Sequence, residues 1–374
     1  MKYIDLRNKN LIKLPDNIDI NVEYLDLSHN NLCLLPENFS LFKNLKILFL
    51  SNNNFIKIPK VLLKLKNLFM LSFRNNNLIE VNNIPNSIKW LILTNNYIDK
   101  IDSLGHLIHL RKLMLSGNLL KLLPDDIEKC QEIELIRLSN NKFEKVPIII
   151  FKLNNLAWIS MANNPCFSLP KLPSKIDLIK KNKLLLKEKI GEGTAGIVYK
   201  SSFNNCDVAV KHYKGLMTSD GLATNEIYNL CSIKPHNNLI EICGLLYENE
   251  KSNIQGCIMH LFNNYQQISF PPSFQTITRD IYNKNNNDDL KIIENKNNII
   301  QQIEDVLNYL HKNNIIHGDF YGHNIIYNKE KNHCVLTDFG ASFIISEQSL
   351  LNEFIKIEKR AFSIFKNELF SKIK

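Results

Sequence analysis

The strongest constraint on this chain is an internal repeat that runs through its first 170 residues. A unit of 20 to 23 residues follows the template L-x-L-x-x-N-x-L-x-x-L. One such unit cannot bury its apolar face alone, but stacked copies can bury these faces jointly. We therefore predict a solenoid of eight units, whose first apolar positions are Ile4, Leu25, Leu48, Leu71, Leu91, Leu113, Ile136 and Ile159.

Asparagine fills the polar position of the template in seven of the eight units, and the first unit has Lys9 there. A buried amide costs about 1–3 kcal/mol unless it is hydrogen-bonded, so each asparagine should satisfy backbone groups of a turn. Lys9 fits a terminal unit that faces water. The predicted ladder consists of Asn30, Asn53, Asn76, Asn96, Asn118, Asn141 and Asn164.

These units resemble the leucine-rich repeat family, and in particular its variants that close in L-P. The resemblance implies a curved solenoid with a parallel strand ladder on its concave face, which is the usual surface for protein partners. We expect a protein partner or substrate on that face; the alternative is a scaffold that only positions the second half. The closing prolines are Pro15, Pro36, Pro59, Pro124, Pro147 and Pro170.

Composition excludes several other classes of protein. The net charge is +9, but the lysines are spread over both halves, so nucleic-acid binding is not predicted. Asp5 and Arg7 precede any apolar run, and no run reaches about 18 apolar residues, so we expect no signal peptide and no membrane span. The eight cysteines form no C-x-x-C pair and are predicted to be core hydrophobes.

The expected location is cytoplasmic. Usage rich in Asn, Lys and Ile suggests an AT-rich genome, such as that of a bacterium or a large virus. For a virus or an intracellular bacterium, the compartment would be the host cell cytosol.

A chain of 374 residues is expected to form two domains. The repeat pattern ends in the lysine-rich stretch 171–189, which is predicted to be a cap or linker. We place the domains at 1–175 and 176–374. Within the second, the polar segment 283–289 is predicted to be a mobile loop.

A glycine-rich segment opens the second half. Gly191, Gly193 and Gly196 form G-x-G-x-x-G, a spacing that lets the backbone fold tightly over phosphate oxygens. Such a loop continues either into a helix, as in dinucleotide-binding units, or into a second strand. The β-branched residues that follow, and the polar turn after them, favour the hairpin.

From here the sequence resembles a protein kinase, because further motifs follow in that family's order. VAVK ends in Lys211, Glu226 lies on the next helical stretch, HGDFYGHN contains Asp319 and Asn324, and DFG begins at Asp338. The resemblance implies that Lys211 holds the α and β phosphates of ATP and pairs with Glu226. It makes Asp319 the catalytic base, and Asn324 and Asp338 the ligands of Mg²⁺.

The resemblance also implies a nucleotide cleft under the glycine loop, where Thr194 lies among the glycines. The strand pattern around Met259 and His260 would end at the hinge beside adenine. Core packing is an equal alternative for each apolar wall residue. The predicted walls are Val198, Ala209 and Ile326. The residues Ile299, Ile303, Val306, Leu307 and Leu310 predict a helix under the catalytic loop.

The sequence departs from the kinase pattern at three places. Gly318 replaces the arginine before the catalytic aspartate, which suggests independence from activation-loop phosphorylation. Tyr321 replaces the loop lysine, a loss for which His323 or the metal ions could compensate. No A-P-E follows DFG, and the segment 357–365, with Glu358 at the aspartate position, resembles the helix that carries D-x-W-S-F-G in kinases.

The predicted fold class is α/β, with an N-terminal leucine-rich repeat solenoid followed by a two-lobed protein-kinase-like α+β domain with a truncated C-lobe. The predicted function is that of an ATP- and Mg²⁺-dependent serine/threonine protein kinase whose repeats recruit a partner or substrate. One alternative is a pseudokinase scaffold, and another is a small-molecule phosphotransferase. The sequence does not name the substrate, the partner, the mode of regulation or the oligomeric state.

Overall fold

The computed structural model describes residues 2–167, 176–249 apart from 194, 205, 216 and 219, then 254–282 and 295–372. Contacts between Cα atoms divide it into two units. The first contains Met1–Leu156 and Asn164–Cys166, and the second contains Ala157–Asn163 and Phe167–Lys374. The expected boundary at residue 175, Thr194, Pro170 and the predicted loop 283–289 lie outside the described residues.

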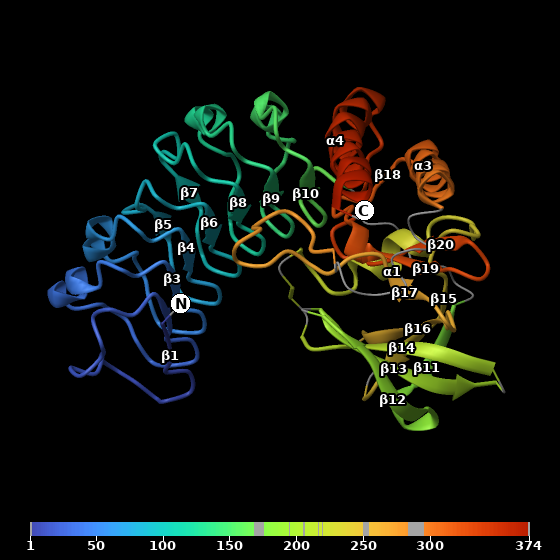
Figure 1. Cartoon of the computed structure of the whole chain (residues 1–374), viewed down its shortest axis with the longest axis horizontal. Coiled ribbons are helices and arrows are strands. Elements are labelled where there is room, and N and C mark those ends of the chain that lie inside the picture. Colours follow the sequence, from blue (N-terminus) through green and yellow to red (C-terminus); the bar gives the residue numbers. More distant parts are fainter. Residues whose placement is uncertain are drawn as a thin grey trace. The chain divides into compact units, whose positions relative to one another are not determined.

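Each repeat of the first unit contributes a short strand, and these strands stack in parallel (Figure 1). Their register aligns the template positions, so that Leu25 pairs with Ile4 on one side and with Leu48 on the other. The ladder strands are β1 (Tyr3–Asp5), β2 (Tyr24–Asp26), β3 (Ile47–Phe49), β4 (Met70–Ser72), β6 (Trp90–Ile92), β8 (Lys112–Met114), β9 (Leu135–Arg137) and β10 (Trp158–Ser160). A separate parallel pair is formed by β5 (Glu80–Val81) and β7 (Lys100–Ile101).

Short 3₁₀ helices lie on the outer side of the arc that these strands form (Figure 1). Each begins directly after the closing proline of its repeat, because proline has a fixed φ and lacks the N–H that the first turn would leave unpaired. They are η1 (Glu37–Leu41), η2 (Lys60–Lys64), η3 (Asp125–Lys129) and η4 (Ile148–Lys152).

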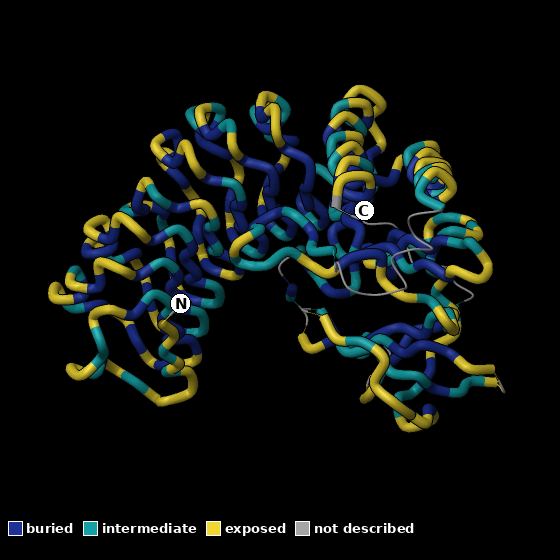
Figure 2. The backbone as a smooth tube through the Cα atoms, viewed as in Figure 1, coloured by how far each residue is buried: buried dark blue, intermediate teal, exposed yellow. Residues whose placement is uncertain are grey.

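The core of the repeats is built from the template leucines, which are almost completely inaccessible to solvent. Leu25, Leu27 and Leu32 of the second repeat have no exposed surface. Figure 2 shows the same burial along the successive strands. The first unit therefore has one continuous apolar core shared by neighbouring repeats, as the period predicts.

The asparagine ladder makes the predicted backbone hydrogen bonds. The Asn53 amide Nδ2 donates to the carbonyl oxygens of Leu27 at 3.0 Å and Leu50 at 3.2 Å, and its Oδ1 accepts from Leu32 N at 2.9 Å. Leu27 and Leu32 belong to the preceding repeat, so each amide joins two repeats.

The residue before each ladder asparagine adopts a left-handed backbone, a feature that the template did not predict. Asn52 and Asn75 both have φ of 54°, and Gly117 has φ of 71° at the equivalent position. Asparagine and glycine tolerate this conformation better than other residues. In the frequent Asn-Asn pairs, the first asparagine thus adopts the left-handed backbone of the turn, and the second makes the ladder hydrogen bonds.

Asn53→Ala is expected to lower the free energy of unfolding by about 1–3 kcal/mol, because buried backbone groups of two repeats lose their partner. Thermal and urea unfolding of the full chain, followed by circular dichroism, measures this change. Asn54→Ala is the matched control, since Asn54 is exposed. Equal destabilisation by both changes would contradict the structural role of the ladder.

The second unit contains a six-stranded sheet with the order β11-β15-β16-β14-β13-β12. Antiparallel pairing of β12, β13 and β14 confirms the hairpin after the glycine loop and excludes the helical alternative. The strands are β11 (Asp177–Lys180), β12 (Leu185–Glu192), β13 (Gly196–Phe203), β14 (Cys206–Tyr213), β15 (Ile242–Tyr247) and β16 (Ile254–His260). The turn η5 (Lys181–Lys183) precedes β12, and the helix α1 (Asn225–Leu230) follows β14.

The remainder of this unit combines the helices α3 (Lys296–Lys312) and α4 (Gln348–Lys372) with several short strands. The helix α3 buries the five apolar residues whose spacing predicted it. The helix α4 begins ten residues after Asp338 and is the one helix that follows DFG in the described part of the chain. The end strand of the repeat ladder, β10, also belongs to this unit. The other short elements are β17 (Gln266–Gln267), β18 (Ile315–Ile316), η6 (Gly322–Asn324), β19 (Ile325–Asn328), β20 (His333–Leu336) and β21 (Phe343–Ile344).

None of the described helices combines the length and the apolar run that crossing a bilayer requires.

Candidate active site

A buried ion pair joins strand β14 to helix α1. Lys211 Nζ lies 2.7 Å from Glu226 Oε2, and the side chains are 12% and 6% exposed. The Tyr213 hydroxyl donates to Glu226 Oε1 at 3.0 Å. Burial opposes the charged form of Lys211, but the carboxylates of Glu226 and Asp338 outweigh it and raise the pKa of Lys211. Lys211 is thus a fixed positive charge within the second unit.

Asp338 presents a carboxylate to the same charge. Its Oδ1 lies 3.8 Å from Lys211 Nζ, and 49% of its side chain is exposed. The backbone of Asp338 is left-handed, with φ of 57°. Lys211 lowers the pKa of Asp338, so this carboxylate is ionised at neutral pH.

The catalytic-loop residues are tied to Asp338 through its neighbour Thr337. Thr337 N and Oγ1 donate to the Asn324 carbonyl at 2.8 and 2.9 Å. The Asn324 amide Nδ2 donates to the Asp319 carbonyl at 2.8 Å and lies 3.4 Å from Asp319 Oδ2. The structure therefore brings Asp319, Asn324 and Asp338 together from two separate stretches of sequence.

A cavity of about 510 Å³ lies between the glycine loop and these residues. This volume is in the range of pockets that hold nucleotide-sized ligands. Its lining contains Gly191, Gly193, Gly196, Val198, Ala209, Lys211, Glu226, Met259, His260, Ile326, Asn324 and Asp338, all predicted from sequence. Asp319 is not in the lining and joins it through Asn324, while Thr194 falls outside the described residues.

The donor set suits Mg²⁺ rather than a metal that prefers nitrogen or sulfur. Asn324 commits its Nδ2 to Asp319, so its oxygen is the atom suited to a hard cation, and Asp338 supplies a carboxylate. The described residues contain no group of three or more His, Cys, Asp or Glu side chains placed to hold a metal. Two protein oxygens completed by substrate phosphates are what Mg²⁺ sites commonly use.

A second polar cluster beside the catalytic loop was not predicted. The buried Asp280 carboxylate accepts from His323 N at 3.0 Å, lies 2.8 Å from His323 Nδ1 and accepts from Ser269 Oγ at 2.6 Å. Burial disfavours the charged imidazole, but Asp280 outweighs it and raises the pKa of His323. No local motif marks Asp280, because its partner is more than forty residues away in sequence.

Glu358, at the aspartate position of the predicted helix, contacts the backbone of the catalytic loop. Its side chain is 2% exposed, and Oε1 accepts from Gly318 N at 2.9 Å. The other oxygen, Oε2, lies 2.7 Å from His311 Nε2 on α3. Glu358 therefore links α4, α3 and the residue before Asp319.

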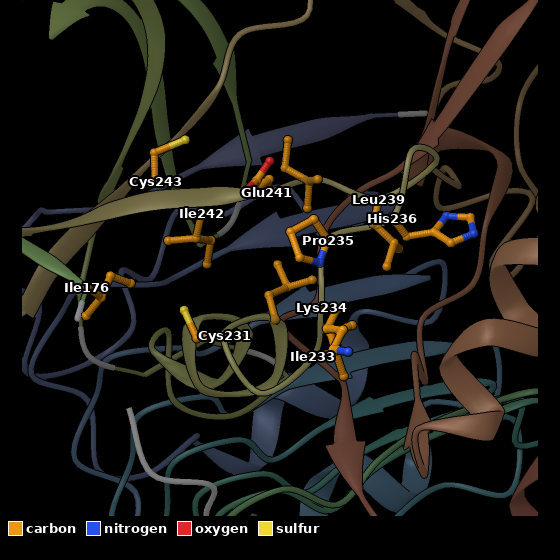
Figure 3. Close-up of a pocket in the computed structure, with 12 residues that line it drawn as sticks. Ile176, Cys231, Ile233, Lys234, Pro235, His236, Leu239, Glu241, Ile242 and Cys243 are labelled. Carbon is orange, nitrogen blue, oxygen red and sulfur yellow. The ribbon is translucent and has the colours of Figure 1, made fainter. Parts of the chain in front are cut away.

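A second cavity, of about 420 Å³, lies beside the C-terminal end of α1 (Figure 3). Cys231 and Cys243 line it, together with Pro235 and Glu241. His236 also lines it and packs on Tyr309 of α3, with ring centroids 4.8 Å apart. None of the predicted site residues belongs to its lining. The charged groups suited to phosphate transfer are therefore at the first cavity.

Comparison with known proteins finds two different domain families in the chain. A model of the protein kinase domain matches residues 184–358, and a model of the leucine rich repeat matches residues 21–42 and 44–65. The chain is a leucine-rich repeat protein with a protein-kinase-like domain. The predicted fold class, α/β with leucine-rich repeats followed by a kinase-like domain, is confirmed.

Curated relatives of this leucine-rich repeat protein with a kinase-like domain are similar over less than half of its length. Cyclin-dependent kinase 1 of Encephalitozoon cuniculi is 28% identical over 159 residues, which are 41% of this chain and 48% of that protein. A serine/threonine-protein kinase of Acanthamoeba polyphaga mimivirus is 32% identical over 175 residues, 44% of this chain and 28% of that protein. The chain thus spans less than half the length of either relative.

Among solved structures, YopM, a leucine-rich effector protein from Yersinia pestis, is 29% identical, with a TM-score of 0.36. The match covers 41% of each chain.

Glu358→Gln is expected to lower the free energy of unfolding at neutral pH by about 1–3 kcal/mol, since buried donors lose a charged acceptor. Burial by itself would raise the pKa of Glu358. The hydrogen bonds from His311 and the Gly318 N–H outweigh burial, so the pKa of Glu358 is lowered. A lowered pKa stabilises the fold above the ordinary value of about 4.3, and this stabilisation is lost as the pH falls through the folded value. The difference between variant and wild type should therefore be at its full size well above a pH of about 4.3, and it should shrink as the pH falls below that value and through the folded pKa.

Chemical unfolding of the full chain at several pH values measures this difference. Glu353→Gln is the control on the same helix, because Glu353 forms a partly exposed ion pair with Lys356 and should change stability by less than about 1 kcal/mol. A Glu358→Gln difference that does not depend on pH would contradict the assignment.

Proposed function

We propose that the chain is an ATP- and Mg²⁺-dependent serine/threonine protein kinase. The observation that carries this proposal is that Lys211, Asn324 and Asp338 line one cavity, and that Asn324 is hydrogen-bonded to Asp319. Phosphoryl transfer depends mostly on positioning and on stabilising charge, and this arrangement offers both. The kinase domain model and the names of the relatives support the same class.

The proposed roles follow from the position of each group. Lys211, held by Glu226, would neutralise the α and β phosphates. Asn324 and Asp338 would hold Mg²⁺, which neutralises charge that develops on the phosphate oxygens. The glycine loop would cover the phosphates with backbone N–H groups, since its glycines lack side chains that would keep them away.

Asp319 would act on the substrate hydroxyl. As the serine or threonine oxygen bonds to the γ phosphorus, the bond from phosphorus to the β–γ bridging oxygen breaks and ADP leaves. The hydroxyl proton passes to the Asp319 carboxylate. Asn324 Nδ2, bonded to the Asp319 backbone carbonyl, would keep that carboxylate in position.

The repeats are proposed to bind a protein partner or substrate on their concave face. An aromatic run covers the first strands of the ladder, where the rings of Tyr3 and Tyr24 are 4.5 Å apart and those of Tyr24 and Phe49 are 5.6 Å apart. Tyr3 is 48% exposed. Exposed aromatic residues contribute strongly to protein interfaces, so these three residues are the proposed contact surface.

Asp319→Asn is expected to reduce phosphate transfer by at least about 100-fold, because the amide cannot accept the hydroxyl proton. Incorporation of labelled γ-phosphate into the chain itself or into a generic substrate measures transfer. Removal of Mg²⁺ with a chelator should abolish transfer by wild type. Asp305→Asn is the control, since Asp305 is on the exposed side of α3.

A second candidate function is that of a pseudokinase scaffold, which the tyrosine at the loop-lysine position favours. Binding of MgATP without turnover, seen as a thermal shift in both wild type and Asp319→Asn, would select the scaffold. Transfer to a small alcohol or amine, with none to protein, would select a small-molecule phosphotransferase. Equal transfer by wild type and Asp319→Asn would reject the proposed base.

A further inference from the structure

The segment Ala157–Asn163 belongs to the second unit, although its sequence is the start of the eighth repeat. It contains β10, and it contacts the catalytic loop on both sides of Asp319. In this it differs from the strands of the other repeats, β1 to β9, which lie in the first unit. The contacts of this segment give it a role that its repeat template does not explain.

The first contact is made by backbone atoms. Ile159 N donates to the Gly318 carbonyl at 2.9 Å. Gly318 has φ of 75°, and a Cβ atom there would collide with the carbonyl oxygen of Ile159. Only glycine fits this close approach without strain. The missing arginine of the kinase pattern is therefore explained by β10, which leaves no space for a side chain at residue 318.

The second contact is made by Trp158, whose side chain is 1% exposed. Its indole Nε1 donates to the Phe320 carbonyl at 2.7 Å. Its ring stacks on Tyr321, with centroids 4.3 Å apart and an angle of 3° between the planes. The tyrosine that replaces the loop lysine therefore serves as the packing partner of Trp158.

The layered arrangement extends further on both sides of this pair. The guanidinium of Arg279 lies over the Trp158 ring, 5.6 Å from its centroid. On the other side, the Tyr321 ring packs on His323 at 4.9 Å. Stacked rings attract each other beyond the burial of their apolar surface, so these layers hold the loop in one position.

The third contact reaches the helix that carries the lysine partner. Asn163 Nδ2 donates to Asn225 Oδ1 at 2.8 Å. Asn225 is the first residue of α1, is 2% exposed and directly precedes Glu226. One short segment thus contacts both the catalytic loop and α1.

We propose that Ala157–Asn163 is a built-in positioning strand for the catalytic centre and that Trp158 is its main positioning residue. In protein kinases with the arginine, a phosphorylated activation loop holds these two regions in place. Here β10 occupies the place beside residue 318, and only nine residues separate Asp338 from α4. The proposal rests on the proposed kinase function and implies that transfer needs no phosphorylated activation loop.

Steady-state kinetics of the full chain test the positioning role. Trp158→Ala should lower kcat by about 10- to 100-fold, because a misplaced catalytic group costs rate more than binding. The KM for ATP should change by less than about twofold, since Trp158 is not in the cavity lining. Trp158→Phe keeps the stacking and should recover most of kcat.

The matched control is Trp90→Ala. Trp90 is the other tryptophan of the chain and has the same place in its repeat strand, but its indole lies against Met114. Its replacement should leave kcat for a generic peptide unchanged. An equal loss of kcat in both variants would mean general destabilisation and would overturn the proposal.

Hydrogen–deuterium exchange separates this proposal from the kinase function itself. In Trp158→Ala, backbone amides of residues 317–324 should exchange at least about tenfold faster, and in Trp90→Ala they should not change. Unchanged exchange in Trp158→Ala would overturn the proposal, whatever the activity. If wild type transfers no phosphate but Trp158→Ala still shows the faster exchange, the proposed function is overturned. The positioning strand is then still supported. If Trp158→Ala does not fold, Trp158→Leu replaces it, because leucine keeps an apolar side chain but loses the stacking and the Nε1 hydrogen bond. Unchanged exchange in Trp158→Leu would overturn the proposal.

Discussion

The candidate site depends on how the backbone of Gly318 is held. Its N–H donates to the buried carboxylate of Glu358, and its carbonyl accepts from Ile159. Both interactions fix the residue immediately before Asp319. Because the Glu358 carboxylate is charged and buried, it is a strong acceptor and fixes the orientation of the Gly318 N–H. The position of the proposed base is therefore set by main-chain atoms, which have little freedom to move.

The ion pair of Lys211 and Glu226 provides the second constraint. Two buried charges give little net stability by themselves, because desolvation offsets most of their attraction. Their value here is geometric, since the pair fixes a strand and a helix in one relative position. The Tyr213 hydroxyl holds the other Glu226 oxygen, so the carboxylate has one orientation. The lysine is then directed towards Asp338 and the cavity.

Features set by local pattern could be predicted from the sequence, and contacts between distant segments could not. The repeat period predicted the strand ladder, and the resemblance to protein kinases predicted that Lys211 pairs with Glu226. Glu358 was identified by its place in a helix motif. The residue 175 boundary and the individual site roles remain predictions.

The missed features share a physical cause. Asp280 pairs with His323, and Trp158 with Tyr321, across long stretches of sequence, and neither pair has a local period or motif. The role of Trp158 was also missed because it occupies a strand position of the repeat template. Trp90 occupies the same position in its own repeat, so the sequence does not distinguish the two. The left-handed residue before each ladder asparagine was missed because the template left that position unspecified.

The division of the eighth repeat restricts how this architecture can be rearranged. Chains that join repeats to an enzyme are often treated as two modules that recombination can exchange freely. Here Ala157–Asn163 belongs by sequence and by strand pairing to the repeats, while most of its contacts are with the kinase-like half. A cut after the last repeat would place Trp158 and Ile159 on the wrong fragment. Evolution of such a protein would thus have to exchange the kinase-like half together with its final repeat strand.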